Sequence, residues 1–169
     1  MNTKRYEDIK IKKQFLGLRG SRGGFTIIEV LIAIAIIGVL SAMVIPYYNS
    51  FLARNELKNA ALKMVDMLRR ARGQAMSGQD DLQWGVHFES GKYVLFRGPS
   101  YGVSDPFNEE ISLPAVLTIS TINLNGGGSN VVFSKIRGET SQFGTTTIQN
   151  DINESKNIVI SQQGVIEER

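Results

Sequence analysis

The chain has no cysteine and a single histidine among its 169 residues, and most of it lacks any excess of positive charge. Without cysteine, disulfides, thiolate metal sites and a cysteine nucleophile are excluded. A Ser-His-Asp triad would have to use His87, and no G-x-S-x-G pattern surrounds a serine. The whole chain has a net charge of +3. Residues 1–24 contribute +5, so the remainder carries −2. The body therefore offers no general electrostatic attraction for nucleic acid.

A long apolar segment follows the basic leader. Residues 25–45 contain one charged side chain, Glu29. As a helix this segment would be about 31 Å long, which matches the hydrocarbon core of a bilayer. Lys and Arg ahead of it predict a cytoplasmic N-terminus and an extracytoplasmic body. A carboxylate is costly in such a segment, so we expect Glu29 to have a role.

A secretory signal peptide and a plain single-span anchor are the alternatives for this segment. Signal peptides usually have about 7 to 15 apolar residues and a small-x-small cleavage site. This run is longer, and Val39-x-Ser41 is only a weak candidate site. Neither alternative explains Glu29.

The stretch GGFTIIEVLIAIAIIGVLSAMVIP resembles the signal of type IV prepilins and type II secretion pseudopilins. The resemblance consists of a basic leader ending in glycine, then Phe, Thr, two apolar residues and Glu. It implies that a membrane-embedded prepilin peptidase cuts between Gly24 and Phe25 and methylates the new N-terminus on Phe25. Residues 1–24 are then a cleaved leader.

Cleavage would create an ammonium on Phe25 near the Glu29 carboxylate. Four residues apart on a helix, the two groups would share one face, so the pair could close within a subunit. The resemblance implies instead that Glu29 meets the N-terminus of a neighbouring subunit. An unpaired buried charge costs several kcal/mol, so Glu29 would fix the register of assembly.

The second half of the helix is predicted over residues 46–78. Pro46 predicts a kink, because proline lacks an N–H donor and crowds the preceding turn. The pattern is amphipathic and places one apolar stripe toward a sheet. Gly78 predicts the end of the helix. The stripe consists of Leu57, Ala61, Met64, Leu68, Ala71 and Ala75.

Residues 79–169 predict a β-rich domain of short strands. Residues 82–97 read as a hairpin in which Trp84, Val86 and Phe88 share one face. The fold class is α+β, type IV pilin-like: a long N-terminal helix, with a membrane-spanning first half, packed on antiparallel sheets. This part resembles the GspH/FimT branch of minor pseudopilins through ARGQAMSGQ, WGVHFESGKYVLF, VVF and NIVISQQGVIEER. Further strands are expected at 116–122, 131–136, 145–149, 157–161 and 165–167.

Other candidate sites favour structural interpretations. His87 is interpreted as a surface strand residue, and NGGGSN at 125–130 as a flexible turn, since no G-K-S/T follows it. The acidic segment 104–110 offers oxygen ligands of the kind that calcium prefers, but without the spacing of an EF-hand loop. It is therefore interpreted as a solvated loop, with a calcium site as the alternative. We expect no metal and no cofactor.

A basic cluster, Arg69, Arg70 and Arg72, closes the predicted helix. Cations near a helix C-terminus are favoured by the macrodipole, which is the simple interpretation. The alternative is DNA binding, because some GspH/FimT-like proteins serve DNA uptake through a basic C-terminal strand. Here the chain ends in GVIEER, so nucleic-acid binding is not expected.

The sequence therefore predicts a structural, non-enzymatic minor pilin or pseudopilin of the cytoplasmic (inner) membrane, which later enters a pilus or pseudopilus. The resemblance implies three partners: prepilin peptidase, other pilins or pseudopilins, and an inner-membrane assembly platform. A DNA-binding competence pilin is the alternative function, and an anchored extracytoplasmic enzyme is a remote third.

Overall fold

A computed structural model describes residues 23–169, without the side chains of residues 43–47. The predicted leader lies outside the described residues, except for Gly23 and Gly24. The chain forms two compact units, one ending at Val44 and the other running from Ile45 to Arg169. A single helix, α2, spans Ile27–Ser77 and contributes to both.

The first part of α2 carries the predicted membrane segment. Within the part of the chain that is described, no helix combines the length and the apolar character needed to cross a membrane. The helix assignment continues through position 46. The Pro46 side chain lies outside the described residues, and both the kink and the span over 25–45 stay predictions.

The second part of α2 ends where the sequence predicts. Ser77 is its last residue, and Gly78 follows in the left-handed conformation with φ 69°. Glycine adopts this conformation without the clash that a Cβ atom causes, so it stops a helix. The Gly78 amide donates to the Ala75 carbonyl at 3.2 Å. The predicted stop at Gly78 is confirmed.

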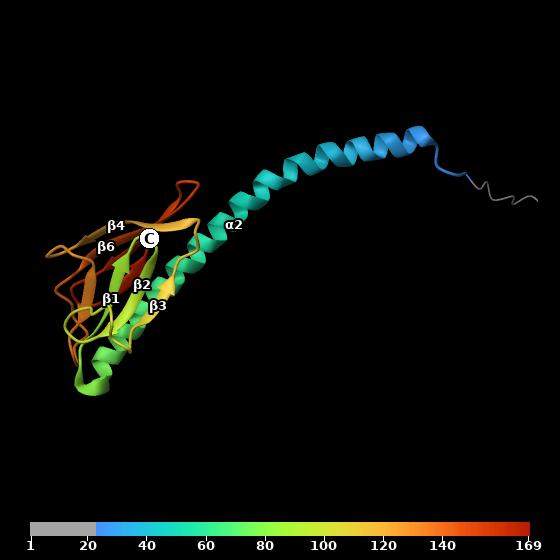
Figure 1. The fold of residues 1–169 in the computed structure, drawn as a ribbon. Helices are drawn as coiled ribbons and strands as arrows, with labels where there is room; N and C mark the ends of the chain where they lie inside the picture. The colour runs from blue at the N-terminus through green and yellow to red at the C-terminus, as the bar shows by residue number, and fades with distance from the viewer. Residues whose placement is uncertain (1–22) are drawn as a thin grey trace, which may run out of the picture. The chain divides into compact units, whose positions relative to one another are not determined.

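Two four-stranded antiparallel sheets form the rest of the body (Figure 1). The first sheet has the order β3-β2-β1-β5, and the second has the order β4-β6-β7-β8. The first contains β1 (Trp84–Glu89), β2 (Lys92–Arg97), β3 (Glu109–Ser112) and β5 (Asn130–Phe133). The second contains β4 (Leu117–Leu124), β6 (Gly144–Asn150), β7 (Ser155–Ile160) and β8 (Ile166–Glu168).

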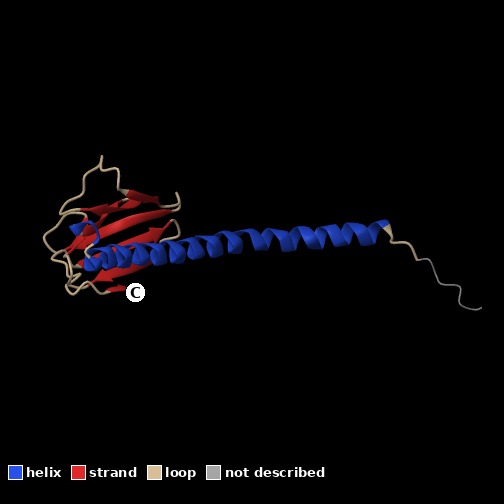
Figure 2. Cartoon of the chain, turned by 90° about the horizontal axis from the view of Figure 1, so that it is seen from below, coloured by secondary structure: helices blue, strands red, loops and turns tan. Residues whose placement is uncertain are grey.

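The core lies between the second part of α2 and the two sheets. Figure 2 shows this part of the helix lying against the strands. All six residues of the predicted apolar stripe are buried, and they join one cluster with Trp84, Val86 and Phe88 of β1. Burial of this apolar surface stabilises the packing of helix on sheet. The predicted α+β class, a long helix packed on antiparallel sheets, is confirmed.

One loop prediction and one strand prediction need correction. The sequence predicts a loop over 104–110, yet Glu109 and Glu110 begin β3, which pairs with β2. The strand predicted over 131–136 ends at Phe133. There the chain turns, and Ile136 takes φ 69° while its amide donates to the Ala75 carbonyl at 3.1 Å. The hydrogen bond to α2 replaces continued strand pairing.

Candidate functional site

The predicted cleavage junction lies outside the helix. Residues 23–26 precede α2, and the Phe25 side chain is 83% exposed. A Cβ atom added at Gly24 would meet no atom within 4 Å, and Gly24 is not among the glycines with positive φ. Among the described residues, neither space nor backbone conformation requires glycine there. A requirement for Gly24 would therefore come from outside the chain.

Thr26 caps the helix, a role that the sequence analysis missed. Its Oγ1 accepts a hydrogen bond from the Glu29 amide at 3.3 Å. Its carbonyl accepts from the amides of Glu29 and Val30, at 3.1 and 3.2 Å. The side chain thus satisfies one of the free amides of the first turn. The signal was present in the sequence, since Thr-x-x-Glu is the pattern of a capping box.

Glu29 occupies the first turn of α2, where a carboxylate interacts favourably with the helix dipole. Its side chain is exposed and has no hydrogen bond or ion pair to any described residue. In the uncleaved chain Phe25 precedes the helix, so Phe25 and Glu29 do not share a helix face there. For the chain cleaved after Gly24 the shared face stays a prediction. The spacing rule that pairs residues i and i+4 applies only inside a helix.

The first part of α2 has no apolar partner among the described residues. Its large hydrophobic side chains are 45% to 82% exposed. A continuous apolar surface of this kind marks a site that lipid or another protein covers. The exposed side chains are Ile27, Ile28, Val30, Leu31, Ile32, Ile34, Ile36, Ile37, Val39 and Leu40.

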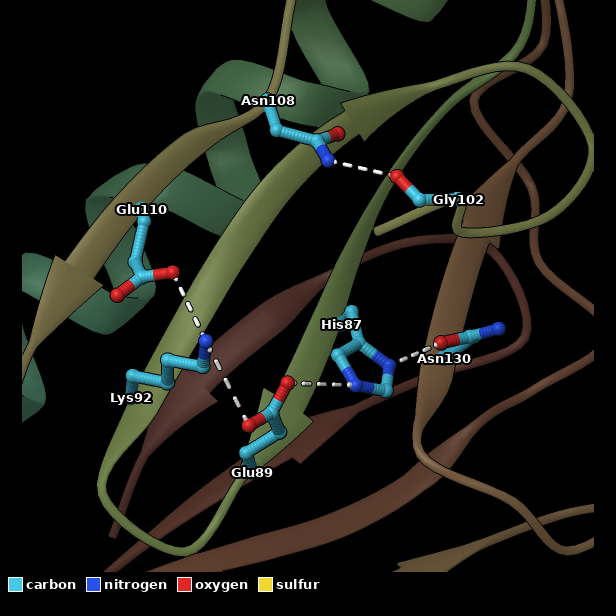
Figure 3. Close-up of polar contacts among 7 residues, drawn as sticks. All are labelled: His87, Glu89, Lys92, Gly102, Asn108, Glu110 and Asn130. Carbon is cyan, nitrogen blue, oxygen red and sulfur yellow. Dashed lines mark hydrogen bonds and ion pairs between the residues drawn. The ribbon is translucent and has the colours of Figure 1, made fainter. Parts of the chain in front are cut away.

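His87 is not a free surface residue, as Figure 3 shows. Its Nδ1 lies 2.6 Å from Asn130 Oδ1, and its Nε2 lies 3.4 Å from Glu89 Oε1. The Tyr101 ring stacks on the imidazole, with centroids 4.1 Å apart. The side chain is 18% exposed, so the surface interpretation holds only in part. Its hydrogen-bonding partners include no nucleophile. The contacts of His87 instead join β1, β5 and the β2–β3 loop.

The acidic segment is paired with cations of the protein. The Glu109 carboxylate meets the Arg70 guanidinium, and this hydrogen bond lowers the pKa of Glu109. Glu110 lies 2.9 Å from Lys92 Nζ, a hydrogen bond that raises the pKa of Lys92 (Figure 3). Asp105 lies 3.9 Å from Arg97. These pairs engage the three carboxylates of the segment, whereas the Asn108 Oδ1 atom is buried without a hydrogen bond to any described residue.

The basic cluster lies before the last turn of α2, which holds no basic residue, so the predicted position at the helix end is wrong. Its arginines are also engaged. Arg69 donates to the Ile166 carbonyl at 3.2 Å. Arg72 donates to the carbonyls of Gly138 and Gln163, at 3.2 and 3.1 Å. Together with the Arg70 pair, these contacts tie the helix to β3, to β8 and to two turns. A guanidinium held this way has fewer donors left for phosphate.

Among residues 23–169, no pattern of ionisable groups suggests catalysis. A surface hollow of about 540 Å³ is lined mainly by Gln, Ser and Thr, and Glu139 is its single ionisable residue. Acid–base chemistry usually needs at least two groups with distinct protonation states. Among the described residues, no group of three His, Asp or Glu could hold a metal ion. Burial raises the pKa of Tyr93 to about 12, which keeps this phenol neutral.

Comparison with known proteins agrees with these features. Residues 19–45 match a family model described as the prokaryotic N-terminal methylation motif. The chain is 35% identical over 103 residues to a fimbrial protein of Pseudomonas aeruginosa, covering 56% of this chain and 67% of that one. It is 38% identical over 76 residues to a fimbrial protein of Moraxella nonliquefaciens, covering 41% and 49%. The match therefore spans between about half and two thirds of these relatives' length.

A solved structure shares the fold. The minor pseudopilin EpsH from the type 2 secretion system of Vibrio cholerae superposes with a TM-score of 0.52. The match covers 68% of this chain and 96% of that one, at 14% sequence identity. At this identity the likeness establishes the arrangement of helix and sheets alone.

Proposed function

Since the chain belongs to the type IV pilin and pseudopilin superfamily, we propose that it is a structural subunit of a type IV pilus or type II secretion pseudopilus. One observation carries the proposal. The non-helical Gly24–Phe25 junction stands directly before a helix whose apolar side chains, up to Leu40, are exposed. Such a helix needs an apolar environment, and a filament core supplies one.

In this proposal the leader remains in the cytoplasm until prepilin peptidase cuts after Gly24 and methylates Phe25. Before assembly the apolar part of α2 lies in the inner membrane, with the body on the extracytoplasmic side. During assembly an inner-membrane platform transfers the subunit into the filament. The same helix then packs against the helices of neighbouring pilins or pseudopilins.

Glu29 directs that transfer. Its carboxylate has no described partner in the single subunit, and Phe25 lies outside the helix face that would bring the two together. The ammonium of a neighbouring subunit can neutralise Glu29 in the filament core. A paired buried charge is tolerated, whereas an unpaired one is costly, so the pair selects one register.

Within the superfamily, we place the chain with the minor pseudopilins of the GspH/FimT branch, as a subunit without catalytic activity. The fold likeness to a minor pseudopilin supports this assignment. The engaged arginines and the acidic C-terminal sequence give no support to a DNA-uptake role.

Processing is the direct test. The full-length chain is coexpressed with a prepilin peptidase, extracted from membranes, and analysed by intact mass and N-terminal sequencing. We expect a mature chain that begins with N-methylated Phe25. A mature N-terminus at any other residue, or an uncut chain in the presence of an active peptidase, contradicts the proposal.

A further inference from the structure

The peptide bond to be cut lies only two residues before α2. Hydrolysis adds water to the Gly24 carbonyl carbon, and the bond to the Phe25 nitrogen breaks. The leader leaves with a carboxylate on Gly24, and the Phe25 amine takes up the proton. The reacting carbonyl must be free to polarise toward donors of the enzyme. A carbonyl already bonded within a helix is less available.

In the structure the Gly24 carbonyl is free of this competition. The first helix bonds end on Thr26, whose carbonyl accepts from the amides of Glu29 and Val30. Within residues 23–169, no hydrogen bond to the Gly24 carbonyl is formed. The Thr26 hydroxyl reinforces this boundary through its 3.3 Å bond to the Glu29 amide.

Without the cap, the helix has another place to begin. Gly24 is itself an acceptable N-cap residue, comparable with threonine and far better than alanine or valine. Phe25 and residue 26 would then become the first helical positions. The Gly24 carbonyl would accept the first helix bond, from the Ile28 amide four residues on. Loss of the Thr26 cap therefore moves the scissile carbonyl into the helix.

We propose that Thr26 is a positioning residue for prepilin cleavage: its hydroxyl caps α2 and keeps the Gly24 carbonyl outside the hydrogen bonding of the helix. The inference rests on the proposed function, since it concerns the same processing step. It assigns no contact between Thr26 and the enzyme. Thr26 acts by setting the fraction of precursor in which the bond can be attacked.

This mechanism predicts an order of cleavage rates among Thr26 variants. The order differs from the one expected if the peptidase recognised the threonine side chain itself. Serine and asparagine cap helices, whereas alanine and valine do not, and valine has nearly the shape of threonine. We expect T26S and T26N precursors to be cut within about twofold of the wild-type rate. We expect T26A and T26V to be cut roughly fivefold more slowly, still at Phe25. The loss should raise KM and leave kcat unchanged, because the competent fraction falls before binding.

A rescue variant distinguishes an effect on the helix boundary from recognition of the threonine side chain by the peptidase. Proline is favoured at the first helical position and keeps the preceding residue out of the helical conformation. Ile27→Pro added to T26V should therefore restore the boundary and return KM toward the value of the single Ile27→Pro variant. Hydrogen exchange of the Ile28 amide reports the boundary directly, because this amide donates to the Gly24 carbonyl only when the helix begins there. We expect slower exchange of this amide in T26V than in T26S.

The assay uses full-length precursors in detergent with purified prepilin peptidase, and Thr121→Ala, at an exposed threonine of β4, serves as the control. Cleavage of T26V at the wild-type rate would overturn the inference. So would slow cleavage of T26N, or failure of the proline rescue, because a peptidase pocket that reads threonine predicts both. Failure of the proposed function looks different, since the wild-type precursor itself would then remain uncut at Phe25.

Discussion

Arg70 on α2 and Glu109 on β3 form a two-point ion pair. Arg70 Nη1 donates to Glu109 Oε1 at 3.0 Å, and Nη2 donates to Oε2 of the same carboxylate. This geometry matches the planar guanidinium to the planar carboxylate. The pair links β3, the edge strand of the first sheet, to α2.

Replacing Glu109 with glutamine should weaken the body in a pH-dependent way. The pKa of Glu109 is lowered in the folded protein, so its charge stabilises the fold above its unfolded pKa of about 4.3. That contribution disappears as the pH falls through the folded pKa. At pH 7 we expect a loss of about 0.5 to 1 kcal/mol, since both side chains are partly exposed.

Chemical unfolding of the full-length protein in detergent at pH 7 and pH 3 measures this effect. Glu56→Gln is the control, because Glu56 lies on the same helix and forms no described ion pair. An equal loss for Glu109→Gln at both pH values would show that the charge of the pair contributes nothing.

Leu68→Ala should be strongly destabilising. Leu68 is completely buried in the core between α2 and the sheets. Removing its side chain leaves a cavity and loses transfer free energy, at a cost of about 2 to 5 kcal/mol. Leu62→Ala on the same helix is the matched control, since Leu62 is 49% exposed. Similar unfolding free energies for the two variants would argue against the described packing of α2.

Gly164→Ala should destabilise the turn between β7 and β8. Gly164 has φ 76°, and a Cβ atom there would lie 2.0 Å from the Gly138 carbonyl oxygen. Strain and clash together should cost more than about 1 kcal/mol. Gly91→Ala is the control, because its Cβ atom would meet nothing within 4 Å. Thermal unfolding that fails to separate the two variants would contradict this turn geometry.

Gly24→Leu should block processing without changing the fold. The side chain enters open space, and Gly24 does not need a positive φ. We expect the uncut precursor to accumulate, heavier by the leader, with the circular dichroism spectrum of a wild-type precursor prepared without peptidase. Efficient cutting of the variant after residue 24 would mean that the enzyme does not require glycine.

The sequence predicts the elements in which apolar residues recur at a regular helical or strand spacing. The helical stripe from Leu57 to Ala75 and the alternation of Trp84, Val86 and Phe88 point to the core, and both are buried there. Gly78 marked the helix end through its backbone freedom alone. These signals are local and depend on burial of apolar side chains, which periodicity reports directly.

Features that depend on tertiary contacts could not be predicted from the sequence. Strand β3 begins with two glutamates that resemble a solvated loop until Arg70 and Lys92 neutralise them. His87 looked isolated because Asn130 and Tyr101, distant in sequence, supply its contacts. The Thr26 cap could be predicted from the sequence, because Thr-x-x-Glu is the pattern of a capping box and its signal is local.

Incorporation of Glu29→Gln into filaments tests whether the Glu29 carboxylate sets the register of assembly. The variant should insert and be cut between Gly24 and Phe25, because the junction is unchanged. In assembly, the ammonium of a neighbouring subunit would lack its counter-charge, a loss that can reach about 3 to 5 kcal/mol. The measurement is recovery of processed protein in sheared filaments, relative to wild type at equal membrane abundance. We predict a large loss of incorporation, and incorporation at the wild-type level would contradict the assignment of Glu29 as the register-setting charge.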